Sequence, residues 1–184
     1  MKALLLIDIQ NDYFPGGRME LEGSEEAGRA AGTLLAAFRE RGLPVFHVRH
    51  ISTRPDAGFF LPDTEGSLIH RSVEPLEDEP VVIKHFPNSF RETTLLGLLR
   101  ERGISELVVA GMMTHMCVDT TVRAACDLGF ACTLAHDACA GRALSFAGRT
   151  VSARDVHTAY MAALNRIFAR VADAAAVCAE LSSR

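Results

Sequence analysis

Three side chains of complementary chemistry, an acid, an amine and a thiol, each follow a short apolar run. Asp8 directly follows the run 3–7, Lys84 closes the run 81–84, and Cys117 comes shortly after a third run. Runs of this kind are typical of strands buried in a parallel sheet. Because ligands bind such sheets outside the carboxyl ends of the strands, we expect the three groups to share one crevice.

Acid, amine and thiol together are suited to acyl transfer through a covalent intermediate. Cys117 follows a polar turn after Gly111 and begins a segment with helical apolar spacing, so it is expected at a helix N-terminus, which lowers a thiol pKa. Asp8 is the candidate base. Lys84 would keep the Cys117 thiolate and the Asp8 carboxylate in their charged forms, because a nearby opposite charge favours ionisation. Considered by itself, Cys117 could equally be a buried, inert cysteine.

Strand-like and helix-like apolar patterns alternate along the rest of the chain and must position these groups. Strands are expected at 3–8, 45–49, 81–84, 107–110, 130–135 and 167–171, with helices between them and after the last. This alternation, without repeats or a linker, predicts one α/β domain over 1–184. The domain should have three layers, α/β/α, around a six-stranded, mainly parallel sheet.

Three motifs stand out in the sequence: LLIDIQNDYFPGG at 5–17, KHFPNSF at 84–90 and GMMTHMCVDTTVR at 111–123. Together they resemble those of the isochorismatase-like cysteine hydrolases, which include the nicotinamidases. The resemblance runs from the first strand to about Ala140 and more weakly beyond it. It implies a Rossmann-like fold of the same architecture and a catalytic triad of Asp8, Lys84 and Cys117. It also implies an oxyanion hole formed by the N–H groups of Met113 and Cys117, with a cis peptide bond before Met113.

The candidate pocket residues are Phe14, Phe60, Asn88, Phe90 and His115. In the family, the aromatic side chain of the loop after the first strand tends to face the substrate, which implies that position for Phe14. The alternative is a side chain packed under the loop. The proline-rich segment 50–80 is too long for a plain connection, so we expect it to form a pocket wall, a subunit contact, or both.

Neither a metal nor another cofactor is expected at this site. Nicotinamidases bind a metal through an Asp-x-His pattern after the second strand, whereas here that region contains His47 and His50 but no acid before Asp56. The two histidines are three positions apart and should face opposite sides of a strand. His70 and His85 are left as possible ligands. Nicotinamide is therefore a less favoured substrate than other amides.

Composition restricts the partners and the compartment. The chain of 184 residues is 48% hydrophobic and has a formal net charge of −4. Its 19 basic residues are spread along the chain, which argues against nucleic acid and anionic membranes and leaves a small-molecule amide as the expected partner. The first apolar run is too short for a signal peptide or membrane span, and the five cysteines form no C-x-x-C pair, so we expect a cytoplasmic protein with reduced thiols. The family resemblance implies a homo-oligomer.

Three functions are compatible with these residues. The leading one is a cysteine-dependent amidohydrolase that cleaves the C–N bond of a small molecule through a thioester acyl-enzyme. A second is vinyl-ether cleavage as in true isochorismatases, but family members with that activity lack the nucleophilic cysteine. A third is a non-enzymatic redox sensor, because an exposed thiolate is also attacked by oxidants. In that case Asp8 and Lys84 would have no role.

Overall fold

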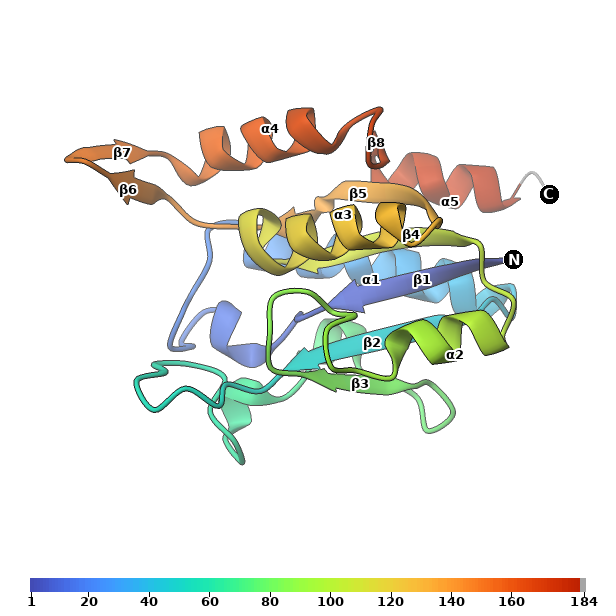
Figure 1. Cartoon of the computed structure of the whole chain (residues 1–184), viewed down its shortest axis with the longest axis horizontal. Coiled ribbons are helices and arrows are strands. Elements are labelled where there is room, and N and C mark those ends of the chain that lie inside the picture. The colour runs from blue at the N-terminus through green and yellow to red at the C-terminus, as the bar shows by residue number, and fades with distance from the viewer. Residues whose placement is uncertain (183–184) are drawn as a thin grey trace.

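Helices cover both faces of a six-stranded sheet in this structure, a computed structural model that describes residues 1–182 (Figure 1). Every strand pair of that sheet is parallel, which confirms the predicted α/β class. The elements are β1 (Lys2–Ile7), α1 (Ser24–Glu40), β2 (Val45–His50), β3 (Val81–Lys84), α2 (Leu95–Glu101), β4 (Glu106–Met112), α3 (Asp119–Asp127), β5 (Ala131–Ala140), β6 (Leu144–Phe146), β7 (Arg149–Val151), α4 (Ala153–Leu164), β8 (Arg170–Ala172) and α5 (Ala174–Ser182). Among the described residues, no helix is both long enough and apolar enough to cross a membrane.

The strand order creates a crevice beside β1. The six strands lie in the order β3-β2-β1-β4-β5-β8, so the chain first moves outward from β1 to β3 and then returns to place β4 on the other side of β1. The chain leaves β1 toward one edge of the sheet and leaves β4 toward the other edge. The two connections therefore diverge at the carboxyl ends of β1 and β4. Such a switch point is where open α/β sheets bind ligands.

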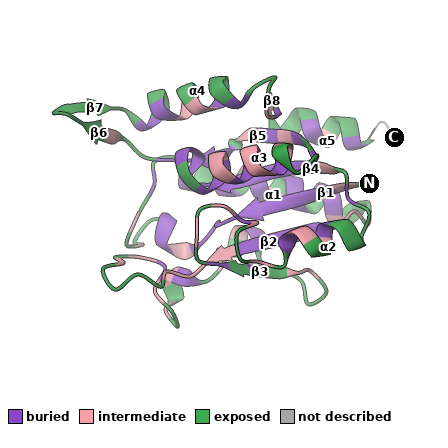
Figure 2. Cartoon of the chain, in the orientation of Figure 1, coloured by how far each residue is buried: buried purple, intermediate pink, exposed green. Residues whose placement is uncertain are grey.

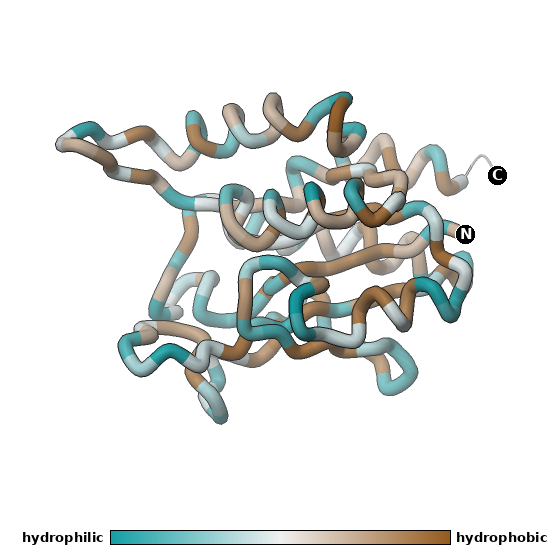
Figure 3. Tube along the Cα trace, viewed as in Figure 1, coloured by the Kyte–Doolittle hydropathy of each residue, from teal (hydrophilic) through white to brown (hydrophobic). Residues whose placement is uncertain are grey.

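Apolar side chains on the two faces of the sheet form two cores. Helices α1 and α5 pack on one face, where Leu34 and Phe38 are fully buried. Helices α2, α3 and α4 pack on the other face, where Leu95, Val122 and Leu164 are fully buried. Buried and hydrophobic residues accordingly run along the central strands (Figures 2 and 3). The two cores hold the carboxyl ends of the strands in fixed positions relative to one another.

Three features of the last third of the chain differ from the sequence prediction. Strand β5 extends to Ala140 instead of ending at 135, because an irregularity in its pairing with β4 lets the chain continue past His136. The last sheet strand is Arg170–Ala172, not 167–171, and Ile167 before it is 75% exposed. The hairpin β6–β7 was not predicted, and Figure 1 shows it projecting away from the sheet.

Candidate functional site

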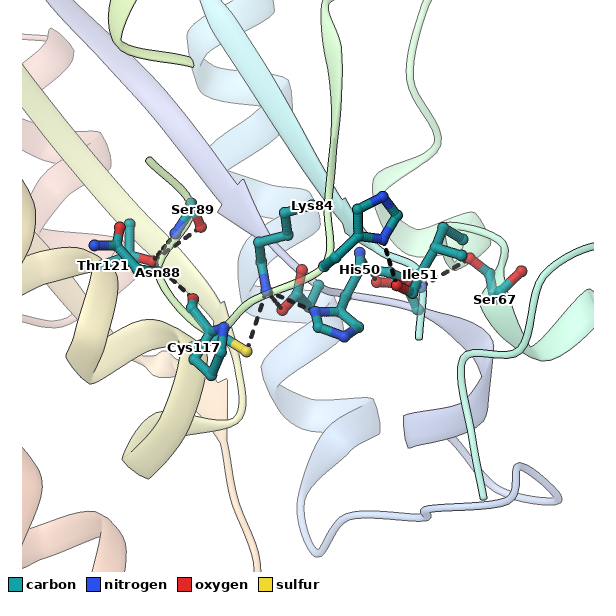
Figure 4. Close-up of polar contacts among 12 residues, drawn as sticks. His50, Ile51, Ser67, Lys84, Asn88, Ser89, Cys117 and Thr121 are labelled. Atoms are coloured by element: carbon teal, nitrogen blue, oxygen red, sulfur yellow. Dashed lines mark hydrogen bonds and ion pairs between the residues drawn. The ribbon is translucent and has the colours of Figure 1, made fainter. Parts of the chain in front are cut away.

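The three chemically complementary residues meet at the crevice beside β1, with Lys84 between the other two. Its Nζ lies 2.6 Å from Asp8 Oδ2 and donates a hydrogen bond to Cys117 Sγ at 3.2 Å. Asp8 and Lys84 are fully buried and Cys117 is 7% exposed. In Figure 4 a dashed line joins the Lys84 side chain to the Cys117 sulfur. The structure therefore brings together all three residues of the expected triad.

Each member of this cluster is placed by the end of a strand. Asp8 directly follows β1 and adopts a left-handed backbone conformation with φ 52°, which turns the chain out of the sheet. Lys84 is the last residue of β3. Cys117 lies in a short π-helical turn, Thr114–Val118, that follows β4 and leads directly into α3. Cys117 is thus in the first helical turn, although the helical segment begins earlier than predicted.

The peptide bond between Met112 and Met113 is cis, as the family resemblance implied. It lies between the end of β4 and the turn that carries Cys117. Met113 is also part of the wall around the Cys117 sulfur.

Burial and charge set the protonation of the cluster. Burial and the Asp8 carboxylate raise the pKa of the Cys117 thiol well above its usual value, against the opposing effect of Lys84. The prediction of a lowered thiol pKa is therefore wrong for the resting site. Burial alone would lower the pKa of Lys84, but Asp8 and Cys117 raise it above its usual value. The resting cluster is a neutral thiol beside a carboxylate–ammonium pair.

A fourth residue, His50, belongs to the cluster and was not recognised from the sequence as a site residue. Its Nδ1 lies 3.1 Å from Lys84 Nζ. Burial, followed by the charge of Lys84, lowers the pKa of His50 to about 4. The prediction that His47 and His50 face opposite sides of the strand is confirmed, because the His47 ring points away from the cluster and pairs with Glu79 at 2.9 Å.

The only group of three candidate metal ligands among the described residues is Asp8, His50 and Cys117, with ligand atoms within 4.8 Å of one another. This set does not suit a metal ion, because the Lys84 ammonium already lies against all three. A divalent cation there would repel that charge. His85 instead pairs through Nδ1 with the Ile51 carbonyl oxygen.

A cavity of about 210 Å³ opens onto Cys117. Aromatic rings of Tyr13, Phe59 and Phe60 form one wall and contact one another, with Tyr13 and Phe60 centroids 4.5 Å apart. The segment between Ser52 and Phe60 contributes to the lining, so part of the proline-rich loop forms a pocket wall as expected. The cavity size suits a compact molecule.

Four of the five expected pocket residues do not line this cavity. Phe14 is buried and stacks on the His70 ring at 3.5 Å, so the alternative of a side chain packed under the loop applies. The Phe90 ring stacks against Phe130 at 6.1 Å in the core. Asn88 turns its Oδ1 back to accept a hydrogen bond from its own loop, at the Phe90 N–H.

His115 also lies outside the cavity. Its ring packs on α4, 6.0 Å from the Tyr160 ring and close to Gly141. Of the expected pocket residues, Phe60 is the one whose side chain lines the cavity. The directions of these loop side chains depend on tertiary packing, which local sequence does not specify.

Comparison with known proteins agrees with this geometry. The model of the isochorismatase domain matches residues 2–176. The isochorismatase family protein YddQ of Bacillus subtilis is 54% identical over 169 residues, which cover 92% of this chain and 94% of that protein. A crystal structure from Oleispira antarctica, described as an isochorismatase hydrolase, is 51% identical with a TM-score of 0.93 and covers 97% of this chain and 96% of that one.

A relative with a named activity extends the comparison. The nicotinamidase/pyrazinamidase of Mycobacterium tuberculosis is 30% identical over 162 residues, which cover 77% of this chain and 87% of that protein. The family model alone spans nearly the whole chain, including Asp8, Lys84 and Cys117. The chain therefore belongs to the isochorismatase family of hydrolases.

Proposed function

We propose that this protein is a cysteine-dependent amidohydrolase that cleaves the C–N bond of a small carboxamide. The observation that carries the proposal is the set of contacts joining Asp8, Lys84 and Cys117 in a buried cluster beside a cavity. The name of the mycobacterial nicotinamidase/pyrazinamidase supports an amide as the substrate class. The family membership supports hydrolysis.

The proposed reaction uses the protonation state of the resting cluster. Because the thiol pKa is raised, Cys117 transfers its proton to Asp8 as its sulfur attacks the amide carbon. The N–H groups of Met113 and Cys117 would stabilise the oxyanion. The C–N bond then breaks, and the departing amine takes the proton from Asp8. Water hydrolyses the thioester, with Asp8 accepting a proton from the attacking water and returning it to the sulfur.

The burial of Cys117 favours this reading over the redox sensor. Oxidants attack exposed thiolates, whereas this thiol is 7% exposed and its pKa is raised by burial. Asp8 and Lys84 also have a role only in the enzymatic reaction.

A panel of small primary amides, assayed for released ammonia, tests the proposal. Cys117→Ala should abolish turnover, while Cys126→Ala should retain it, because Cys126 is a half-buried cysteine of α3 that does not line the cavity. A slowly hydrolysed amide should leave an acyl group on the peptide that contains Cys117, detectable by mass spectrometry. Full activity in Cys117→Ala would rule out the proposed mechanism.

A further inference from the structure

The His50 ring lies between Lys84 and the substrate cavity. His50 is the last residue of β2 and is paired in register with Lys84 on the adjacent strand β3. Its Nδ1 contacts the Lys84 Nζ at 3.1 Å, as Figure 4 shows. Among the described residues, Nε2 of this ring has no hydrogen-bond partner, and His50 is part of the cavity wall. One ring nitrogen is thus engaged by Lys84 and the other is available to a ligand.

The backbone of His50 is fixed from a second direction. The buried side chain of Gln10 accepts a hydrogen bond from the His50 N–H at 2.7 Å and donates one to the His50 carbonyl oxygen at 2.9 Å. Gln10 also donates to the Ser67 carbonyl oxygen at 2.8 Å. The Phe60 ring lies 6.0 Å from the imidazole, centroid to centroid. These contacts hold the ring in one place, as a preorganised site requires.

The contact with Lys84 determines which nitrogen carries the proton. A Lys84 ammonium has only donors, so the His50 nitrogen that faces it must be an unprotonated acceptor. A neutral imidazole then carries its proton on Nε2, which becomes a donor directed to the cavity. Burial most of all, and then the charges of Lys84 and His85, disfavour a charged ring, and only Asp8 favours it, which is why the pKa of His50 is lowered to about 4.

We propose that His50 has two functions, holding the Lys84 ammonium through Nδ1 and donating a hydrogen bond from Nε2 to the substrate. The second function rests on the proposed amidohydrolase activity and defines its substrate class. The substrate would be a compact, uncharged carboxamide with a hydrogen-bond acceptor, such as a second carbonyl, near the scissile amide. Arg54 and Asp56 in the cavity lining pair with each other at 3.1 Å, so their opposite charges offset one another at this wall.

Two variants separate the two functions. His50→Asn places an amide oxygen near the position of Nδ1 and removes the donor at Nε2, so KM should rise about 3- to 10-fold, the effect of one lost hydrogen bond, while kcat changes little. His50→Gln places an amide near Nε2 and removes the acceptor for Lys84, so kcat should fall about 10-fold or more at a nearly constant KM. His136→Asn, a change at an exposed His–Asp pair remote from the cavity, is the matched control and should alter neither constant.

An unchanged KM in His50→Asn would refute the contact with substrate, and an unchanged kcat in His50→Gln would refute the role in holding Lys84. Ring ¹⁵N shifts of the protein labelled at its seven histidines give a readout that needs no turnover. The signals lost in His50→Asn should belong to a neutral Nε2–H ring that does not titrate between pH 8 and 5. A proton on Nδ1, or titration near the usual histidine value, would overturn the proposal. If the wild-type protein hydrolyses no amide, the proposed function fails. The ring tautomer measured by NMR would still test whether His50 Nδ1 accepts a hydrogen bond from Lys84.

Discussion

Replacing Lys84 with methionine tests the structural basis of the site without reference to a substrate. Lys84→Met keeps a side chain of similar length but removes the only cation that contacts the fully buried Asp8 among the described residues. Removing one partner of a buried ion pair typically costs about 3–5 kcal/mol, because an uncompensated charge is left in a low-dielectric interior. Lys84→Met should therefore be destabilised by about that amount.

Urea denaturation followed by circular dichroism, with a thermal scan, measures this loss. For a chain of this length, about 3–5 kcal/mol corresponds to a decrease in Tm of roughly 6–20 °C. Arg170→Met is the matched control, because Arg170 pairs with Glu180 at 2.7 Å on the surface, with both side chains about half exposed. That change should cost no more than about 1 kcal/mol.

The double variant Asp8→Asn/Lys84→Met discriminates between a lost charge pair and a general packing defect. Because it removes the orphaned carboxylate charge as well, it should be more stable than Lys84→Met alone. Two outcomes contradict the reasoning: a loss in Lys84→Met no larger than in Arg170→Met, or a double variant whose loss equals the sum of the two single losses.

Two other predictions concern pH and metal. Burial of Glu79 would raise its pKa, but hydrogen bonds from Arg39, the Leu76 N–H and His47 lower it from the ordinary 4.5 to about 2, so its contribution to stability is complete above pH 4.5 and is lost as the pH falls toward 2. Glu79→Gln should remove this part of the acid sensitivity, as urea unfolding at pH 6, 4 and 3 would show; an unaltered pH profile would count against it. Because the Lys84 ammonium lies against all three candidate ligands, amidase activity should survive chelation, and elemental analysis should find no stoichiometric zinc, iron or manganese. Chelator-sensitive activity with bound metal would overturn this and return nicotinamide to first place among the substrates.

The fold class and the strand ends that carry the acid, the amine and the thiol were predictable because local sequence specifies them. Short runs rich in apolar and β-branched residues specify buried parallel strands, and a charge at the end of each run marks where the strand leaves the core. Asp8 and Lys84 were identified in this way. The hairpin β6–β7 was not predicted because each of its two strands has only three residues, which is too short for a periodic pattern.

His50 could not be assigned from the sequence because its role depends on which strands are neighbours. Its ring reaches Lys84 since β2 and β3 are paired with these two residues in register, and strand order is a tertiary property. The spacing of His47 and His50 correctly indicated that they face different ways. It could not indicate what His50 faces. Phe14 and His115 lie outside the cavity for a related reason, since packing beneath their loops determines where their side chains lie.

The charges of the buried cluster explain why these four residues occur together. At rest, the Asp8 carboxylate and the Lys84 ammonium cancel, while the Cys117 thiol and the His50 ring are neutral. In the proposed reaction, the thiol proton would move to Asp8, the thiolate would take over the negative charge, and the sum would stay at zero. A protonated His50, or a thiolate beside an ionised Asp8, would leave a net charge in this buried cluster, and that is costly. Under the proposed mechanism, the same charge balance that raises the thiol pKa in the resting site would allow the nucleophile to form during attack, because the Lys84 ammonium contacts both the proton donor, Cys117, and the proton acceptor, Asp8.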